Sequence, residues 1–429
     1  MKHFHWYKAL ALGIGALSLR LLYVAVAGRH VGIEAGKDAV SYDQFARLMM
    51  SGWDWISTPL AVREPLYPAF VALSYRLPGS EIGTLQLMQA LAGALTVAIV
   101  YLTLRTMLQE RIAIIAAALI ALHPHFIVYT AEPLRENLII PLLAGALMLF
   151  LLAMKNGGVW RLFLCALFFA LLVHTDVRFL PLMVVIPAMA FAWHHRVGLA
   201  IRQTAWLWLV FAILMVPYQV RCYVAMGKPV IVTERFLGKW LDRAASVMSS
   251  NKGTAGNRRL AWLQEWEAKK RQNLDNVSPE ERAFFLSGGR PETDRLAVHW
   301  ILFTEYWRFA LFKNMYRPYP DGRFEKPWSL KHDVASGMIM IPFLILLPFV
   351  FLGSSAQSRR VVYPLMIYLA SNSLMHVFVH ARERYRTPME IVIAVLVAVA
   401  VVNLWRLVRR EKYEPHVEGE EAARENRFT

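Results

Sequence analysis

Residues 36–68 read GKDAVSYDQFARLMMSGWDWISTPLAVREPLYP, and this stretch decides how the rest of the chain is interpreted. It directly follows the first long apolar segment, residues 8–27, and brings carboxylates, an Arg-Glu-Pro step and several aromatic residues to its end. An apolar segment of about 20 residues is long enough to cross a membrane, so the polar residues that follow it lie at a membrane surface. The chemistry of this chain is therefore sought at that surface.

The composition is that of a membrane protein. The chain has 429 residues, of which 57% are hydrophobic and 18% charged, and its mean hydropathy is +0.37. A soluble chain of this length carries more charge and fewer apolar runs. The formal net charge is +16, but the basic residues form short clusters between apolar segments, a pattern that indicates membrane topology and not binding to nucleic acid. We therefore expect an all-α, polytopic integral membrane protein.

The apolar segments and the basic clusters between them predict a topology. About ten segments have the length of a spanning helix, at residues 8–27, 84–107, 112–130, 137–154, 159–174, 178–195, 203–221, 336–353, 361–380 and 388–405. Lys and Arg gather in alternate short connections, which the positive-inside rule assigns to the cytoplasm. Both termini are then cytoplasmic. Cys165 and Cys222 are placed toward opposite membrane faces, so we expect no disulfide between them.

The same topology divides the chain into parts. An N-terminal transmembrane module at 1–222 carries an external, catalytic loop at 28–83, an external helical loop covers 223–335, C-terminal transmembrane helices cover 336–406, and a cytoplasmic tail expected to be disordered covers 407–429. Within the first loop, residues 65–79 (PLYPAFVALSYRLPG) are too short to span the membrane and have prolines near both ends. They predict a helix that lies along the interface.

The unusual polar residues all fall at or just beyond the external ends of the predicted helices. A single cleft on that side could collect them: Asp38, Asp43, Arg63, Glu64, Glu132, Arg135, Glu136, His174, Asp176, Arg178, Arg221, His380, Arg382, Glu383, Arg384 and Arg386.

Asp38 is the candidate proton acceptor. It stands four residues before Tyr42, so the two share one face of a helix. A carboxylate at a membrane surface near cations is suited to remove a proton from an incoming nucleophile. The alternative is that Asp38 is the N-cap of the helix that follows it.

The arginines are candidates for binding a phosphate. Residues 380–388, HARERYRTP, concentrate arginine in a short external connection, although the positive-inside rule disfavours this position. Dense guanidinium groups suit the phosphate of a lipid headgroup; the alternative is that this connection is cytoplasmic. Arg63 presents its side chain either to such a phosphate or to lipid headgroups as an anchor. Glu136 belongs either to the site or to a salt-bridged helix start.

The sequence contains no recognised cofactor motif. His123 and His125 flank Pro124, and His194 and His195 lie among basic residues, but none has the spacing of a known metal motif. Nucleotide-binding fingerprints and a nucleophile elbow are also absent. No cofactor is therefore required, a divalent metal is optional and not indicated, and the energy for a reaction must come from the substrate.

Several motifs, taken in order, resemble the polytopic GT-C glycosyltransferases, in particular bacterial relatives of the protein O-mannosyltransferases and of the lipid A aminoarabinose transferase. They are Asp38-x-x-x-Tyr42 leading into FARLMMSG, then REPLYPAFVAL, ALHPHFIVYTAEPLRENLIIPLL, VPYQVRCYVAMGKPVIVT and ERYRTPMEIVIAV. The resemblance runs from the first predicted span to the last. It implies transfer of a sugar from a polyprenyl-phosphate carrier, such as undecaprenyl phosphate, to a glycan, lipid or protein acceptor on the external face of a bacterial inner membrane.

The resemblance also implies roles for residues. Asp38 matches the first-loop acid that looks like the general base, Glu136 matches the acid after the third span, and Arg221 matches an Arg whose partner Asn is here Cys222. Arg384 and Arg386 match the late basic motif expected near the donor phosphate. The expected enzyme is inverting, and its substrate-binding residues are Tyr42, Arg63, Glu64, Glu136, Arg178, Arg221, Arg382, Arg384, Tyr385 and Arg386.

Two other functions share some of these features. A lipid-phosphate transporter or flippase would use the same arginines but needs a polar path through the spans, in which Arg20 is the clearest ionisable residue. A polymerase or ligase of surface polysaccharide shares both the sidedness and the lipid phosphate.

Overall fold

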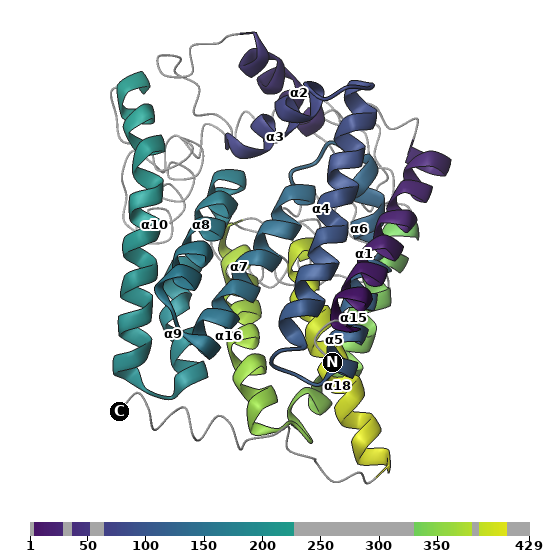
Figure 1. The fold of residues 1–429 in the computed structure, drawn as a ribbon, viewed down its shortest axis with the longest axis vertical. Coiled ribbons are helices and arrows are strands. Elements are labelled where there is room, and N and C mark those ends of the chain that lie inside the picture. Colours follow the sequence, from purple (N-terminus) through teal and green to yellow (C-terminus); the bar gives the residue numbers. More distant parts are fainter. Residues whose placement is uncertain (1–3, 29–36, 52–63, 227–329, 380–385, 410–429) are drawn as a thin grey trace, which may run out of the picture.

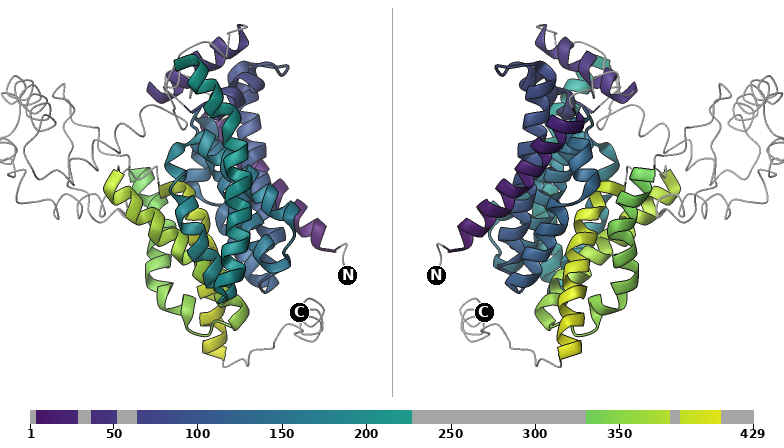
Figure 2. Two further views of the ribbon diagram at one scale, coloured as in Figure 1. Left: turned by 90° about the vertical axis from the view of Figure 1, so that its left-hand side faces the viewer. Right: turned by 90° about the vertical axis from the view of Figure 1, so that its right-hand side faces the viewer.

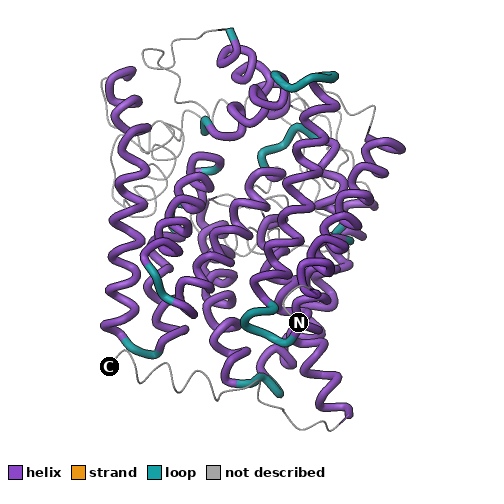
Figure 3. The backbone as a smooth tube through the Cα atoms, in the orientation of Figure 1, coloured by secondary structure: helices purple, strands orange, loops and turns teal. Residues whose placement is uncertain are grey.

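The computed structural model of the chain describes residues 4–28, 37–51, 64–226, 330–379 and 386–409. Every regular element in these residues is a helix (Figure 3). The predicted all-α polytopic fold is therefore confirmed. The predicted external subdomain at 223–335 and the tail at 407–429 lie largely outside the described residues.

The helices follow one another along the chain with short connections. In order they are α1 (Phe4–Tyr23) with η1 (Val24–Gly28), α2 (Lys37–Met50), α3 (Leu66–Tyr75), α4 (Glu81–Leu104), α5 (Glu110–Ala121), α6 (Pro124–Val128) with η3 (Tyr129–Ala131), α7 (Glu136–Asn156), α8 (Val159–Thr175), η4 (Val177–Phe179), α9 (Leu182–His194), α10 (Val197–Met226), α15 (Leu330–Phe351), α16 (Ala356–Val379), η7 (Thr387–Met389) and α18 (Glu390–Arg409).

Each predicted span coincides with one of these helices or with a broken pair. Among the described residues, 6 helices are long and apolar enough to cross a membrane, and α5 with α6 raises the number to 7 if the bent pair is one span. The pair bends by 52° because Pro124 cannot continue α5 and holds His123 in an extended conformation. The predicted interfacial helix at 65–79 is α3.

The two kinds of connection lie at opposite ends of the bundle. Figure 1 shows α2 and α3 across the upper end, and the connections α4–α5, α9–α10 and α15–α16 at the lower end. The lower connections and the residues beside them include Arg105, Arg196 and Arg359, which belong to the basic clusters. The predicted separation of basic connections from the loop that carries Asp38 is thus present in the fold.

The side views show how the ends of the chain pack on its middle. In Figure 2, α1 runs obliquely along one side of the bundle, and α15, α16 and α18 cover the other. Helix α1 packs on α4, α18 packs on α15 and α5, and α16 packs on α9. Helices from the two ends of the chain therefore enclose α4, α5 and α7.

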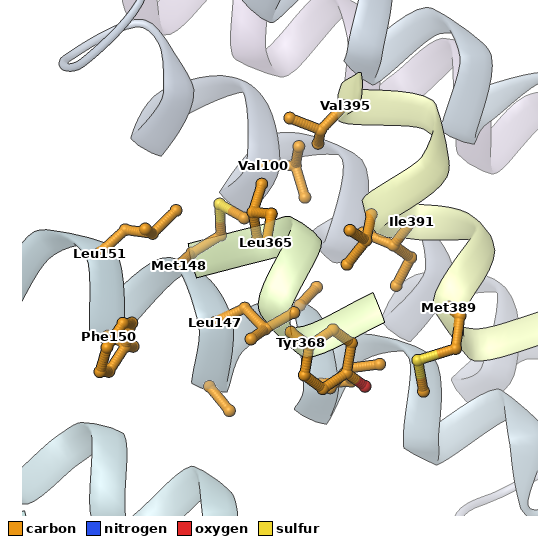
Figure 4. Packing of buried hydrophobic residues seen from close by; sticks show 14 of the residues in the cluster. Val100, Leu147, Met148, Phe150, Leu151, Leu365, Tyr368, Met389, Ile391 and Val395 are labelled. Carbon is orange, nitrogen blue, oxygen red and sulfur yellow. The ribbon is translucent and has the colours of Figure 1, made fainter. Parts of the chain in front are cut away.

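The core lies where α4, α7, α16 and α18 meet. Figure 4 shows Val100, Leu147, Tyr368 and Ile391, one from each of these helices, within the buried hydrophobic cluster. Helices α7 and α18 are apolar on nearly all sides, as expected of helices surrounded by others. Both cysteines are buried and free, so the described structure has no disulfide between them, as expected.

Candidate functional site

Helix α2 carries the candidate base. Asp38 is the second residue of α2, with a half-buried side chain, and does not occupy the position before the helix where an N-cap stands. One turn later Tyr42 is only 2% exposed and meets Tyr67 edge to face, with ring centroids 4.8 Å apart. The predicted shared helical face is therefore present, and Tyr42 anchors Asp38 above α3.

Asp43, the neighbouring carboxylate, has a different environment. It pairs with Arg47 at 3.0 Å and accepts a hydrogen bond from the Tyr75 hydroxyl at 2.9 Å. Arg47 also pairs with Glu81 at 2.6 Å. Burial together with the bond to Asp43 raises the pKa of Tyr75. These contacts tie α2 to α3 and α4, so the geometry gives Asp43 a structural role.

Glu64, Arg135, Asp176 and Arg178 form an ion-pair network that we call the acid–arginine cluster. Arg135 Nη1 lies 3.0 Å from Glu64 Oε2, and Arg135 Nη2 lies 3.4 Å from Asp176 Oδ2. Arg178 Nε donates to Asp176 at 2.9 Å, and the Arg178 backbone N–H donates to the same carboxylate at 3.1 Å. The cluster therefore joins the segment before α3 to the starts of α7 and η4.

The charges within the cluster compensate for its burial. Burial alone would raise the pKa of the fully buried Asp176, but the charges of Arg135 and Arg178 hold it well below its usual range. Burial would likewise lower the pKa of Arg135, but Asp176, Tyr42 and Glu64 raise it above its usual value. Asp176 and Arg135 therefore remain charged at neutral pH.

Glu136 lies beside this cluster. It begins α7, is only 2% exposed, and lies within electrostatic range of Arg135 together with Tyr42 and Glu64. Burial, Tyr42 and Glu136 raise the pKa of Tyr67 well above its usual value. Glu136 is thus brought near Tyr42 and Glu64, as the predicted single site requires.

Hydrogen bonds from α4 and α7 hold the segment that leads to Glu136. Tyr67 donates to Gln89 Oε1 at 2.8 Å, and Gln89 Nε2 donates to the backbone oxygens of Thr130 and Glu132 at 2.9 and 3.1 Å. Asn137 Nδ2 donates to the backbone oxygen of Tyr129 at 2.7 Å. Buried backbone oxygens are satisfied in this way, and the segment is fixed.

Arg221 reaches the same region from α10. It is buried, its Nη1 lies 3.9 Å from Cys222 Sγ, and Tyr218 one turn earlier lies within electrostatic range of both Arg221 and Glu64. Cys222, which replaces the Asn of the related motif, is fully buried beside it. Tyr218 therefore links Arg221 to Glu64 of the acid–arginine cluster electrostatically.

Arg386 belongs to a separate group. It is fully buried, and its Nε donates to Glu390 Oε1 at 3.1 Å, while Glu390 Oε2 faces His123 and His125. Sequence reasoning noted the two histidines but missed Glu390, because it is 265 residues from His125 and no spacing connects them. The other predicted residues Arg63, Arg382, Arg384 and Tyr385 lie outside the described residues.

Arg20 does not line a path through the bundle. Its Nη1 donates to the backbone oxygens of Ala16 at 3.0 Å and Ala121 at 3.5 Å, and Gly93 leaves room for its guanidinium on α4. Ala121 ends α5, where a carbonyl lacks its helical partner. Arg20 therefore stabilises the break between α5 and α6.

Comparison with known proteins agrees with this fold. Residues 59–220 match the model of the dolichyl-phosphate-mannose-protein mannosyltransferase family. The oligosaccharyltransferase AglB from Archaeoglobus fulgidus, in complex with an inhibitory peptide and a dolichol-phosphate, has a TM-score of 0.56 at 16% identity over 97% of this chain and 52% of its own. A second AglB structure, with Zn and sulfate, has a TM-score of 0.57 at 15% identity over 94% and 50%.

A further structural match is ArnT from Cupriavidus metallidurans bound to undecaprenyl phosphate, with a TM-score of 0.43 at 13% identity over 91% of this chain and 77% of ArnT. No curated protein sequence matches the chain. The chain spans about half the length of AglB. The family match and the AglB fold confirm the resemblance to the polytopic GT-C glycosyltransferases, and the protein has the fold of that class.

Proposed function

We propose that the protein is a membrane-embedded glycosyltransferase that moves a sugar from a polyprenyl-phosphate-linked donor to an acceptor. The observation that carries this proposal is the meeting of Asp38-bearing α2, buried Glu136 and the acid–arginine cluster at one end of the bundle. Much of this end lies in residues 59–220, which match a mannosyltransferase family. The basic connections lie at the opposite end, so the proposed site faces the outside of a bacterial inner membrane and both termini face the cytoplasm.

Asp38 is the proposed general base. Its carboxylate takes the proton of an acceptor hydroxyl, and the oxygen attacks the anomeric carbon of the donor sugar as the bond to the phosphate oxygen breaks. The electron pair of that bond leaves with the lipid phosphate, and a single displacement inverts the anomeric centre. No nucleotide is needed, because the donor phosphate is the leaving group.

Arginines hold the leaving phosphate in this proposal. A guanidinium placed where negative charge develops stabilises the transition state. Arg384 makes the direct contact, with help from Arg63 or from the buried Arg221. Because Arg386 is buried and paired with Glu390, we give it a positioning role at the start of α18. Arg135 and Arg178 are neutralised by their carboxylates and hold the wall of the site.

The donor and acceptor classes rest on the related proteins. One AglB structure contains a dolichol-phosphate and a peptide, which supports a polyprenyl phosphate and a peptide or glycan acceptor for this chain. The arginines that we propose for the phosphate site also suit such a carrier.

The test is a transfer assay with purified protein in liposomes. We expect wild-type protein to move radiolabel from a polyprenyl-phosphate sugar to an envelope acceptor fraction, and Asp38→Asn to lower the rate by about 10²–10⁴-fold, the usual contribution of a general base. Asp43→Asn is the control on the same helix, and its rate should stay within about threefold of wild type, because its contacts are structural.

The two parts of the proposal fail differently. Transfer by Asp38→Asn at the wild-type rate would remove Asp38 from the chemistry and leave the transferase function standing. Absence of transfer by folded wild-type protein across a panel of polyprenyl-phosphate sugars would contradict the function itself.

A further inference from the structure

His123, His125 and Glu390 form a buried group of metal-ligating side chains that the proposed transfer reaction does not use. His123 stands in the break between α5 and α6, His125 in the first turn of α6, and Glu390 at the start of α18. All three side chains are at most 2% exposed. We call them the His–His–Glu cluster.

The spacing of the ligand atoms fits one metal ion. Glu390 Oε2 lies 3.1 Å from His123 Nε2 and 3.3 Å from His125 Nδ1, and one ligand atom from each residue lies within 4.8 Å of the others. Zinc bonds of about 2.0–2.1 Å in a tetrahedron place two ligand atoms about 3.3 Å apart. The distances from Glu390 Oε2 to His123 Nε2 and to His125 Nδ1 are both close to this separation.

The direction of the contacts also favours a shared ion. His123 Nε2 lies close to the carboxylate but makes no hydrogen bond with it, and His123 Nδ1 has no hydrogen-bond partner among the described residues. Buried imidazole nitrogens are normally satisfied. Ligand atoms around a bound ion point toward the ion and not directly at one another, and His123 Nε2 and Glu390 Oε2 are arranged in this way.

The surroundings hold the cluster in place. The His123 ring stacks on Phe126 with centroids 4.3 Å apart, and the His125 ring stacks on Tyr129 with centroids 5.8 Å apart. Pro124 fixes the backbone between the two histidines. Arg386 donates to Glu390 Oε1 and leaves Oε2 facing the histidines, as outer-shell partners of metal-binding carboxylates do.

Arg386 also places a positive charge close to the proposed metal ion, which disfavours binding of a cation. Without an ion, Arg386 and Glu390 neutralise each other; a divalent ion adds two positive charges to a buried site. Glu136 and Glu390 both lie within electrostatic range of Tyr129, so Glu136 offsets part of this excess. An anionic fourth ligand, such as hydroxide, offsets the rest.

We infer that His123, His125 and Glu390 bind one divalent transition-metal ion, and that the ion joins the broken α5–α6 span to the start of α18. Two imidazoles and one carboxylate suit zinc, and three protein ligands leave a fourth position open. This site goes beyond the proposed transfer reaction, because its ligands belong to the α5–α6 break and to α18, and no step of that reaction uses them.

The test measures metal directly. Full-length protein with its affinity tag removed is purified in detergent, equilibrated with Zn²⁺, freed of excess ion and subjected to elemental analysis. We expect about one zinc ion per chain in wild type, and at least a tenfold loss in His123→Ala and in Glu390→Gln, since even outer-shell changes cost about 10–100-fold in affinity. His174→Ala removes another largely buried histidine, whose ring contacts Ala170 and Tyr218, and should keep the ion.

A second measurement keeps the inference testable if a variant fails to fold. Co²⁺ added to wild-type protein should give the visible absorption bands of a tetrahedral site, and added Zn²⁺ should remove them. Zinc absent from folded wild type, or retained by both His123→Ala and Glu390→Gln, would overturn the inference.

Discussion

At the scale of single residues, the acid–arginine cluster makes stability depend on pH through Asp176. The folded pKa of Asp176 lies below its unfolded value of about 3.9, so its stabilisation is complete above that value and is lost as the pH falls through the folded pKa. Asp176→Asn leaves Arg135 and Arg178 without this partner and should cost about 3–5 kcal/mol at pH 7, as for a broken buried ion pair.

The measurement for Asp176 is thermal unfolding in detergent, followed by tryptophan fluorescence between pH 7 and about pH 3. The difference between wild type and Asp176→Asn should shrink as the pH falls. Glu110→Gln is the control, because Glu110 pairs with Lys8 at a half-exposed position and should contribute at most about 1 kcal/mol. A difference that stays constant with pH would show that Asp176 acts by its shape and not by its charge.

At the scale of the helices, the packing of α7 on α8 depends on Gly145. A Cβ at this position would lie 2.3 Å from the Phe168 ring, so even a methyl group must displace that ring. We expect Gly145→Ala to lower the free energy of unfolding by about 1–2 kcal/mol, because overpacking outweighs the gain in helix propensity. Gly15→Ala in α1 meets nothing within 4 Å and should be neutral or slightly stabilising.

Phe168→Leu combined with Gly145→Ala tests the cause of that loss. If the clash with the ring is responsible, the double variant should recover part of the stability that Gly145→Ala loses, and the two effects will not add. Equal melting temperatures for Gly145→Ala and wild type, measured in the same detergent, would mean that Phe168 moves aside without cost.

The helices were predictable because they depend on local properties of the sequence. Hydropathy located each apolar segment, and residues 65–79 were predicted as a short helix. The break at Pro124 was missed, because residues 112–130 were predicted as one continuous span. The environment of Asp38 was only half predictable, since spacing placed it on one face with Tyr42 but did not exclude the N-cap position. Helix bounds follow local rules, whereas the role of a side chain depends on its neighbours in space.

The candidate site was less predictable, because its pairs join distant parts of the chain. Glu64, Arg135 and Asp176 appeared only as charges at one membrane level, and the pairing of Arg135 with both carboxylates needs the packing of α3, α7 and α8. Glu390 gave no signal, because a carboxylate at the start of an apolar helix indicates no site until α18 lies against α6. A single sequence carries no information on such contacts.

At the scale of the whole molecule, the separation of polar chemistry from basic connections predicts how the protein sits in a membrane. Arg76 follows α3 at the upper end of the bundle, and Arg359 lies in the first turn of α16 at the lower end; both are exposed. The native Cys165 and Cys222 are buried, so single cysteines at these arginines should react above a low background. If basic connections face the cytoplasm, a reagent that does not cross membranes should label Arg76→Cys from outside and Arg359→Cys only after the membrane is opened.

Whole cells of a bacterial host, and inverted vesicles prepared from them, supply the two sides for this labelling experiment. Arg76→Cys should react in cells and be protected in inverted vesicles, and Arg359→Cys should show the reverse. The matched pair removes differences in charge, because the same residue type is replaced at each end. The reverse pattern would show that the bundle has the opposite orientation in the membrane, with Asp38 on the cytoplasmic side. The donor sugar would then have to be presented from the inner leaflet. Labelling of both variants from one side would contradict the two-ended arrangement of the basic connections, and with it the positive-inside argument for the site.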